Sequence, residues 1–244
     1  MRRLYALVPL KNLSCAKTRL ANALADADRS ALVMAMAHDV TVALAQSRLI
    51  ERVVLVSDIA DLPDLIGVPG VTRYIPASAC GLNEDLSEAA VWAGDQGATD
   101  VLIAHADLPL LTPALIDRFA QATRPGELRI APCKHDSGTN LLLAPLPLPL
   151  VYGAGSLARF QSLAAAAGLS CDLWRNPMLA MDIDELADYE ALQFLCQHGS
   201  FRNSATAALL RRQMGQMGRS LRTEIQPQLR YGSSFHKKIA LFST

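Results

Sequence analysis

The chain of 244 residues is 51% hydrophobic and 19% charged, and its net charge at pH 7 is zero. This length allows one full domain with a large core, or one domain plus an appendage. The charge is uneven, because Phe201–Thr244 hold eight Lys and Arg against one acid, Glu224, and the first 200 residues are correspondingly acidic. An acidic body argues against nucleic-acid binding and is compatible with a protein that collects divalent metal.

The five cysteines are widely spaced, and no CxxC or Cys/His cluster occurs. We therefore expect reduced thiols in a cytoplasmic protein rather than a zinc site or disulfides. The apolar run after Arg2-Arg3 is brief and ends at Lys11, so we expect no signal peptide. The least charged stretch, Ser137–Ala158, contains three prolines and three glycines, which argues against a membrane span.

Strand and helix patterns alternate along the first half of the chain, which is typical of a parallel, doubly wound sheet. Strands are expected at 4–10, 52–57, 71–75 and 101–106, with helices at 28–46, 84–95 and 112–122. Further strands are expected at 128–132, 139–144 and 169–174, with helices at 156–167 and 185–197. Ser156 is a candidate N-cap.

We thus predict one α/β domain over residues 1–199 with a mixed, mostly parallel central sheet. A basic C-terminal extension over 200–244, partly disordered, is expected to follow it. Within this extension, 205–217 could be helical.

Three carboxylates stand at positions where a ligand edge is expected. Asp107 ends the apolar run Val101–Ala106, and a Leu-Pro break follows it. Ligands bind at the carboxyl ends of strands in open α/β sheets. Asp182 and Asp184 flank Ile183, so in extended geometry both point to one side. Together the three would suit Mg²⁺, although each could instead be a helix cap.

A cationic loop follows the first strand, with Lys11, Lys17 and Arg19. Its position at the ligand edge suits a triphosphate, and we expect its cations to face Asp107 across the site. The chain has neither a P-loop motif nor GxGxxG. The alternative interpretation is a solvated loop.

Two glycine-containing turns stand out, Gly138-Thr139-Asn140 and Tyr152–Ser156. The second leads into a helix start, where backbone N–H groups favour an anion. His135 lies in the loop before Gly138, whereas His105 lies inside an apolar strand and is expected to be structural. No GxSxG or HExxH motif occurs. A reaction at phosphorus explains this absence, because it needs positioning and charge stabilisation more than covalent catalysis.

The ordered set of segments resembles the 2-phospho-L-lactate guanylyltransferase family (CofC/FbiD) of coenzyme F420 biosynthesis. The segments are LVPLKNLSCAKTRL, GLNEDLSEA, HADLPLLTP, SGTNLLL, YGAGS and MDID. The resemblance implies a single-domain, Rossmann-like nucleotidyltransferase related to GT-A and MobA-like proteins. It also implies transfer of GMP from GTP to a phosphorylated three-carbon acid, which is 2-phospho-L-lactate, phosphoenolpyruvate or 3-phosphoglycerate, with release of pyrophosphate.

The resemblance also implies residue roles. The implied catalytic residues and Mg²⁺ ligands are Asp107, Asp182 and Asp184. The implied nucleotide-binding residues are Lys11, Lys17, Arg19, Gly81 and Asn83. The implied acceptor-binding residues are Thr139, Gly153 and Ser156, to which we add His135.

The sequence departs from the family where it has Cys133-Lys134, since an Asp-Arg pair is frequent there. Lys lacks the bidentate fork of Arg, so the acceptor's identity stays open. Two other functions also stay open: a nucleotidyltransferase for a molybdopterin or sugar phosphate, and a non-catalytic GTP-binding regulator. The first usually begins with an LAGGxSxRM-type loop, which is absent here, and the second needs no complete set of carboxylates.

Partners beyond the substrates are not specified by the sequence. The resemblance implies that a downstream transferase uses the guanylylated product. A homodimer and a transient contact of the basic extension with that transferase both stay open. Nucleic-acid and membrane partners are not expected.

Overall fold

The computed structural model describes residues 2–11, 17–77, 81–199, 201 and 204–215. In these residues a seven-stranded sheet has the order β3-β2-β1-β4-β6-β5-β7. The strands are β1 (Leu4–Pro9), β2 (Ile50–Val56), β3 (Thr72–Tyr74), β4 (Asp100–Ala104), β5 (Glu127–Pro132), β6 (Thr139–Pro145) and β7 (Ser170–Leu173). Only β6 runs antiparallel to its neighbours, β4 and β5. The predicted single-domain α/β fold with a mixed, mostly parallel sheet is confirmed.

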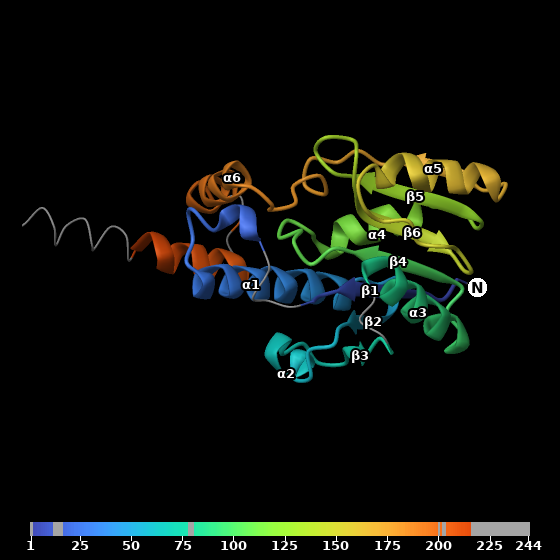
Figure 1. Ribbon diagram of the computed structural model, residues 1–244, viewed down its shortest axis with the longest axis horizontal. Helices are drawn as coiled ribbons and strands as arrows, with labels where there is room; N and C mark the ends of the chain where they lie inside the picture. The colour runs from blue at the N-terminus through green and yellow to red at the C-terminus, as the bar shows by residue number, and fades with distance from the viewer. Residues whose placement is uncertain (1, 12–16, 78–80, 200, 202–203, 216–244) are drawn as a thin grey trace, which may run out of the picture.

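Helices cover both faces of this sheet (Figure 1). The helices are α1 (Asp26–Ala45), α2 (Leu62–Ile66), α3 (Leu82–Asp95), α4 (Pro113–Gln121), α5 (Ser156–Ala166) and α6 (Leu186–Gln197), with a short 3-10 turn η2 (Thr18–Leu20). Helices α1 and α4 pack on one face, and α3 and α5 on the other. Side chains of β1 alternate between the two faces, as a strand buried on both sides requires. Among the described residues, no helix is long and apolar enough to cross a membrane.

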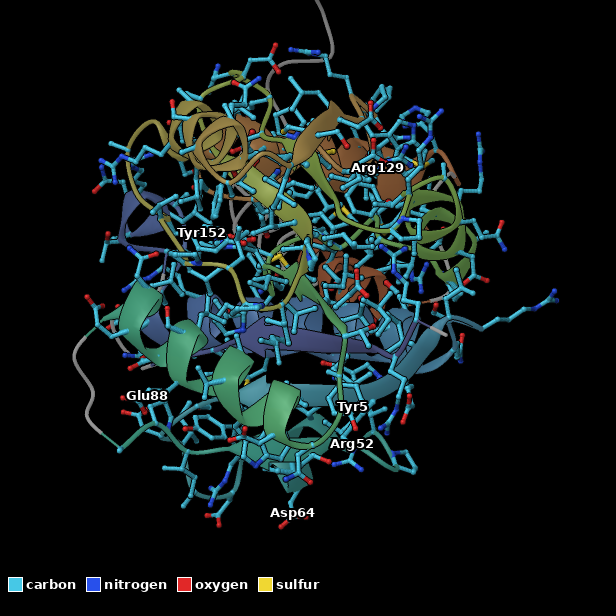
Figure 2. All side chains as sticks on the ribbon, turned by 90° about the vertical axis from the view of Figure 1, so that its right-hand side faces the viewer. Tyr5, Arg52, Asp64, Glu88, Arg129 and Tyr152 are labelled. Carbon is cyan, nitrogen blue, oxygen red and sulfur yellow. The ribbon has the colours of Figure 1, made fainter. Side chains whose placement is uncertain are left out.

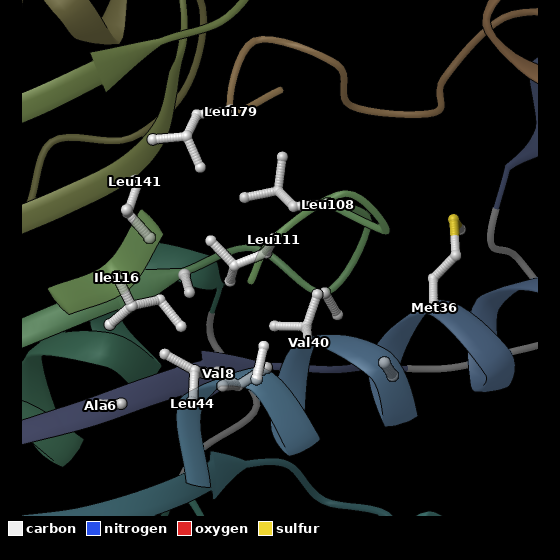
Figure 3. Packing of buried hydrophobic residues seen from close by; sticks show 14 of the residues in the cluster. Ala6, Val8, Met36, Val40, Leu44, Leu108, Leu111, Ile116, Leu141 and Leu179 are labelled. Atoms are coloured by element: carbon white, nitrogen blue, oxygen red, sulfur yellow. The ribbon is translucent and has the colours of Figure 1, made fainter. Parts of the chain in front are cut away.

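The core also anchors the loops that carry the acids. Leu108 and Leu111, which follow Asp107, pack in the larger apolar cluster with Val40 and Ile116 (Figure 3). Ile183, between Asp182 and Asp184, is fully buried in the same cluster. Because these apolar neighbours are held inside, each acid stands at a fixed place on the edge of the core.

The C-terminal segment adjoins the core beside α1 (Figure 1). Residues 205–215 are helical, and Ala207 and Leu210 are fully buried. The Asp39 carboxylate on α1 accepts the backbone N–H groups of Ala205 and Thr206, at 2.8 and 2.9 Å. The described part of the predicted extension therefore packs on the domain. Residues 216–244 lie outside the described part of the chain.

Candidate active site

Three acids meet at the carboxyl edge of the sheet. The backbone N–H of Ile183 donates to the carbonyl oxygen of Asp107 at 3.2 Å, which ties the segment 182–184 to the end of β4. Asp107, Asp182 and Asp184 all line one cleft of about 470 Å³. The structure thus brings together the three carboxylates that the sequence singles out.

Lys17 lies between two of these acids. Its Nζ donates to Asp107 Oδ2 at 2.5 Å and to Asp184 Oδ1 at 2.6 Å. The expectation that Lys17 would face Asp107 across the site is therefore wrong, because adjacent carboxylates attract the nearest cation. Burial opposes charge on both partners, but attraction outweighs it: the pKa of Lys17 is raised and the pKa of Asp107 is lowered.

Asp182 has a different partner. Its Oδ1 accepts a hydrogen bond from Asn140 Nδ2 at 3.1 Å, and the same amide donates to the Leu179 carbonyl at 2.9 Å. Burial, together with the charges of Asp107 and Asp184, raises the pKa of Asp182.

Asp107 Oδ1 is buried and has no hydrogen-bond partner among the described residues. As the described side chains stand, no three of the His, Cys, Asp and Glu residues form a metal cage. The Mg²⁺ role of Asp107, Asp182 and Asp184 therefore stays a prediction.

A second cleft of about 370 Å³ opens between the cationic loop and α1. Lys11, Lys17 and Arg19 line it, and their role in binding a nucleotide stays a prediction. The Lys11 ammonium pairs with the buried carboxylate of Asp85 in the first turn of α3. The Arg19 side chain is 70% exposed and approaches Glu185 Oε1 only to 3.4 Å, so it can turn towards a ligand.

The contacts of Asn83 in the structure differ from the predicted contact with the nucleotide. Its amide is doubly bonded to the backbone of Tyr152: Nδ2 donates to the carbonyl at 3.1 Å, and Oδ1 accepts the N–H at 2.6 Å. Figure 2 shows Tyr152 beside this end of α3. Neither Gly81 nor Asn83 is among the described residues that line the two clefts. Asn83 thus holds the acceptor loop, and a nucleotide role for either residue stays a prediction.

The predicted acceptor residues, Thr139, Gly153, Ser156 and His135, all line the 470 Å³ cleft. Ser156 is not the N-cap: Gly155 takes that position in a left-handed conformation (φ 70°), which glycine adopts without strain. The Ser156 hydroxyl instead donates to Thr139 Oγ1 at 3.1 Å. The pair joins the start of α5 to the start of β6.

Lys134 supports the segment that carries Asp184, a role that sequence reasoning missed. Its Nζ donates to Asp188 Oδ1 at 2.5 Å. The other oxygen of Asp188 accepts the backbone N–H groups of Asp184 and Glu185, at 3.1 and 2.9 Å, in the capping box of α6. The Lys134–Asp188 pair therefore fixes the approach of Asp184 to the cleft.

Cys133 begins the turn between β5 and β6. Its sulfur accepts the backbone N–H of Gly138 at 3.1 Å. Burial would raise the pKa of this thiol, but backbone N–H groups of the turn, including those of His135 and Ser137, bring it below its ordinary value.

His105 lies just after its strand and not inside it, as the sequence had suggested. Strand β4 ends at Ala104, and the His105 side chain lines both clefts. Its ring meets the Tyr152 ring edge-on, with 5.1 Å between centroids, and its Nε2 is buried with no partner among the described residues. One signal was present in the sequence: in an extended chain, residues two apart face the same side, and His105 precedes Asp107 by two.

The two clefts share one wall. Residues that line both are Arg19, His105, Asp107 and Asp184. A ligand in one cleft therefore meets a ligand in the other across a strongly charged boundary. This arrangement suits the transfer of a group between two bound molecules.

Comparisons with known proteins identify the family of this chain. The family described as "Guanylyl transferase CofC like" matches residues 4–223. A relative from Sphaerobacter thermophilus named phosphoenolpyruvate guanylyltransferase is 38% identical over 77% of this chain and 91% of its own length. A relative from Phenylobacterium zucineum named 3-phospho-D-glycerate guanylyltransferase is 34% identical over 71% of this chain and 82% of its own.

Solved structures share the fold. A putative nucleotide-diphospho-sugar transferase from Desulfovibrio desulfuricans has a TM-score of 0.71 at 21% identity, covering 88% of this chain and 96% of that one. A nucleotidyl transferase from Methanothermobacter has a TM-score of 0.55 at 15% identity, covering 79% and 96%. At these identities the likeness concerns the fold alone, whereas the sequence matches extend across nearly the whole described chain. The chain therefore belongs to the CofC-like guanylyl transferase family.

Proposed function

We propose that this chain transfers GMP from GTP to the phosphate of a phosphorylated three-carbon acid, with release of pyrophosphate, in coenzyme F420 biosynthesis. Family membership supports guanylyl transfer, and the names of the relatives make phosphoenolpyruvate and 3-phosphoglycerate the first acceptors to test. The observation that carries the proposal is the pair of clefts that share Asp107 and Asp184 as a common wall.

We assign the triphosphate of GTP to the 370 Å³ cleft, where Lys11, Lys17 and Arg19 gather. Cations on a loop at the carboxyl edge of a sheet suit a polyanion. The guanine and ribose would extend towards Gly81 and Asn83 at the start of α3.

We assign Mg²⁺ to Asp107, Asp182 and Asp184. Hard carboxylate oxygens suit this ion, and Asp107 Oδ1 is buried without a partner among the described residues. The Lys17 ammonium between Asp107 and Asp184 marks the place as one that holds positive charge. When bound, the ion would neutralise charge on the phosphates and on the leaving pyrophosphate.

We assign the acceptor to the 470 Å³ cleft, with Thr139, Gly153, Ser156 and His135 around its phosphate and carboxylate. In the first turn of α5 the N–H groups of Ser156 and Leu157 already donate to backbone carbonyls, at 3.0 and 3.3 Å, so we assign the anion to the side chains of this cleft. An acceptor phosphate oxygen attacks the α-phosphorus in line, a new P–O bond forms, and the bond to the β-phosphate breaks. The attacking oxygen is already anionic, so no general base is needed.

We also propose partners for this protein beyond its substrates. The segment 216–244 carries five Lys and Arg and a single acid, which would suit docking to an acidic partner such as the downstream transferase. Light scattering would show whether the protein is a homodimer, and co-elution with that transferase at low and high salt would test the docking. We also propose that the protein works in the cytoplasm, where its thiols stay reduced.

An acceptor screen tests the proposed function. The protein is incubated with GTP, Mg²⁺ and each of the three acids, and pyrophosphate and guanylylated product are measured together. ATP and CTP in place of GTP, and a sugar phosphate in place of the acid, are the controls. We expect product with GTP and at least one three-carbon acid. Product with a sugar phosphate only, or GTP binding without any product, would overturn the proposal.

A further inference from the structure

We propose that His105 is a catalytic residue of the transfer, which donates a hydrogen bond from Nε2 to the phosphate oxygens where the two clefts meet. The inference rests on the proposed function. It adds a residue that belongs neither to the three carboxylates nor to the cationic loop. His105 is one of only four described residues that line both clefts, and the other three are an arginine and two aspartates.

The state of its ring points to a ligand. Nε2 is buried and has no hydrogen-bond partner among the described residues. A buried nitrogen without a partner costs free energy, and a bound phosphate oxygen would remove that cost. Asp107, two residues away, lines the same wall between the clefts. A phosphate that contacts His105 would therefore also lie next to the Asp107 carboxylate.

The His105 ring packs against an aromatic side chain. Its edge-on contact with Tyr152 has 5.1 Å between centroids, and Tyr152 meets Phe160 in the same way at the same distance. The backbone of Tyr152 is in turn held by both ends of the Asn83 amide. A donor fixed in this way before the ligand arrives is preorganised for the charge that develops during transfer. Tyr152 and Asn83 are positioning residues in this chain of contacts.

The chemistry needs no proton transfer by His105. An oxygen of the acceptor phosphate bonds to the α-phosphorus, the α–β bridging bond breaks, and pyrophosphate leaves with the electron pair. During this step negative charge is concentrated on the non-bridging oxygens of the α-phosphate. A hydrogen bond to one of those oxygens that is stronger in the transition state than in the ground state raises kcat.

Three substitutions at position 105 separate this role from a packing role. Leu removes the donor, Gln carries an amide N–H close to the place of Nε2, and Asn carries one near Nδ1. We expect His105→Leu to lower kcat by about a hundredfold, as loss of one transition-state donor does elsewhere, while GTP binding stays unchanged. Gln should restore part of the rate, and Asn should not.

Two further variants test the support of the ring. Tyr152→Phe keeps the aromatic contact with His105, so it should lower kcat less than Tyr152→Leu does. Tyr152→Leu removes the contact and should lower kcat less than His105→Leu does.

The experiment measures kcat and KM for GTP and for the acceptor, with GTP affinity by titration calorimetry and folding by thermal unfolding. An inactive wild type would defeat the proposed function itself. An active wild type with His105→Leu at the same rate, or with Gln no better than Asn, would defeat only the inference about His105. If the Leu variant does not fold, the comparison of Gln with Asn still decides.

Discussion

Replacing Lys17 with Met tests the ion-pair cluster at the centre of the site. The Lys17 side chain is 11% exposed, and its removal leaves Asp107, 23% exposed, beside Asp184 without a counter-charge. Removing one partner of a buried pair costs about 3–5 kcal/mol, and the 45% exposure of Asp184 reduces our expectation to about 2–3 kcal/mol. For a domain of this size the unfolding midpoint should fall by about 4–12 °C.

The pH dependence of this loss gives a second check on its cause. Lys17 holds the pKa of Asp107 below its ordinary value although burial opposes this. The stabilisation is therefore present above the unfolded-state pKa of about 4 and is lost as the pH falls through the folded-state pKa. The gap between wild type and Lys17→Met, measured by thermal unfolding followed by circular dichroism, should shrink in acid.

The matched control for Lys17→Met is Arg19→Met. Its side chain is 70% exposed and lies 3.4 Å from Glu185, so its loss should change stability by less than about 1 kcal/mol. A Lys17→Met protein as stable as wild type at pH 7, or a gap that widens in acid, would refute the reasoning.

Truncation after residue 215 should leave the unfolding temperature and the transfer rate unchanged. Truncation after residue 200 should lower the unfolding temperature, because residues 205–215 pack on the core. Equal unfolding temperatures of the two truncated proteins would contradict this. Cys133 should react with iodoacetamide at lower pH than Cys171 does in peptide mass spectrometry. At Cys133 backbone N–H groups lower the thiol pKa against the effect of burial, whereas burial and then neighbouring acids raise the pKa of Cys171. Asn83→Ala should raise the KM for the acceptor more than the KM for GTP, because Asn83 holds Tyr152; the reverse result in steady-state kinetics would return Asn83 to the nucleotide.

The position of Asp107 was predictable because it depends on local pattern. An apolar run followed by an acid and a Leu-Pro break indicates the ligand edge of a buried strand, and the alternation at 182–184 indicates two acids facing one way. The buried Ile183 then holds them there. These features follow from periodicity and burial, which the sequence displays directly.

The partners of polar side chains were not predictable, because they come from distant parts of the chain. The contact of Lys17 with Asp184 spans 167 positions, and that of Asn83 with Tyr152 spans 69. No local pattern distinguishes a cation that meets phosphate from one that meets a carboxylate. His105 was misplaced for a simpler reason: β4 ends two residues earlier than its apolar run suggests.

Guanylyl transfer by Asp107→Asn tests the central claim most directly, because Asp107 lies in the wall shared by both clefts and has a buried oxygen without a partner among the described residues. The variant is incubated with GTP, Mg²⁺ and the acceptor that the wild type prefers, and the guanylylated product is quantified. Asp64→Asn, an exposed change on α2 well apart from Tyr152 in Figure 2, is the control. We predict a folded Asp107→Asn protein that forms no product beside a fully active Asp64→Asn protein. Transfer at the wild-type rate by folded Asp107→Asn would contradict the account.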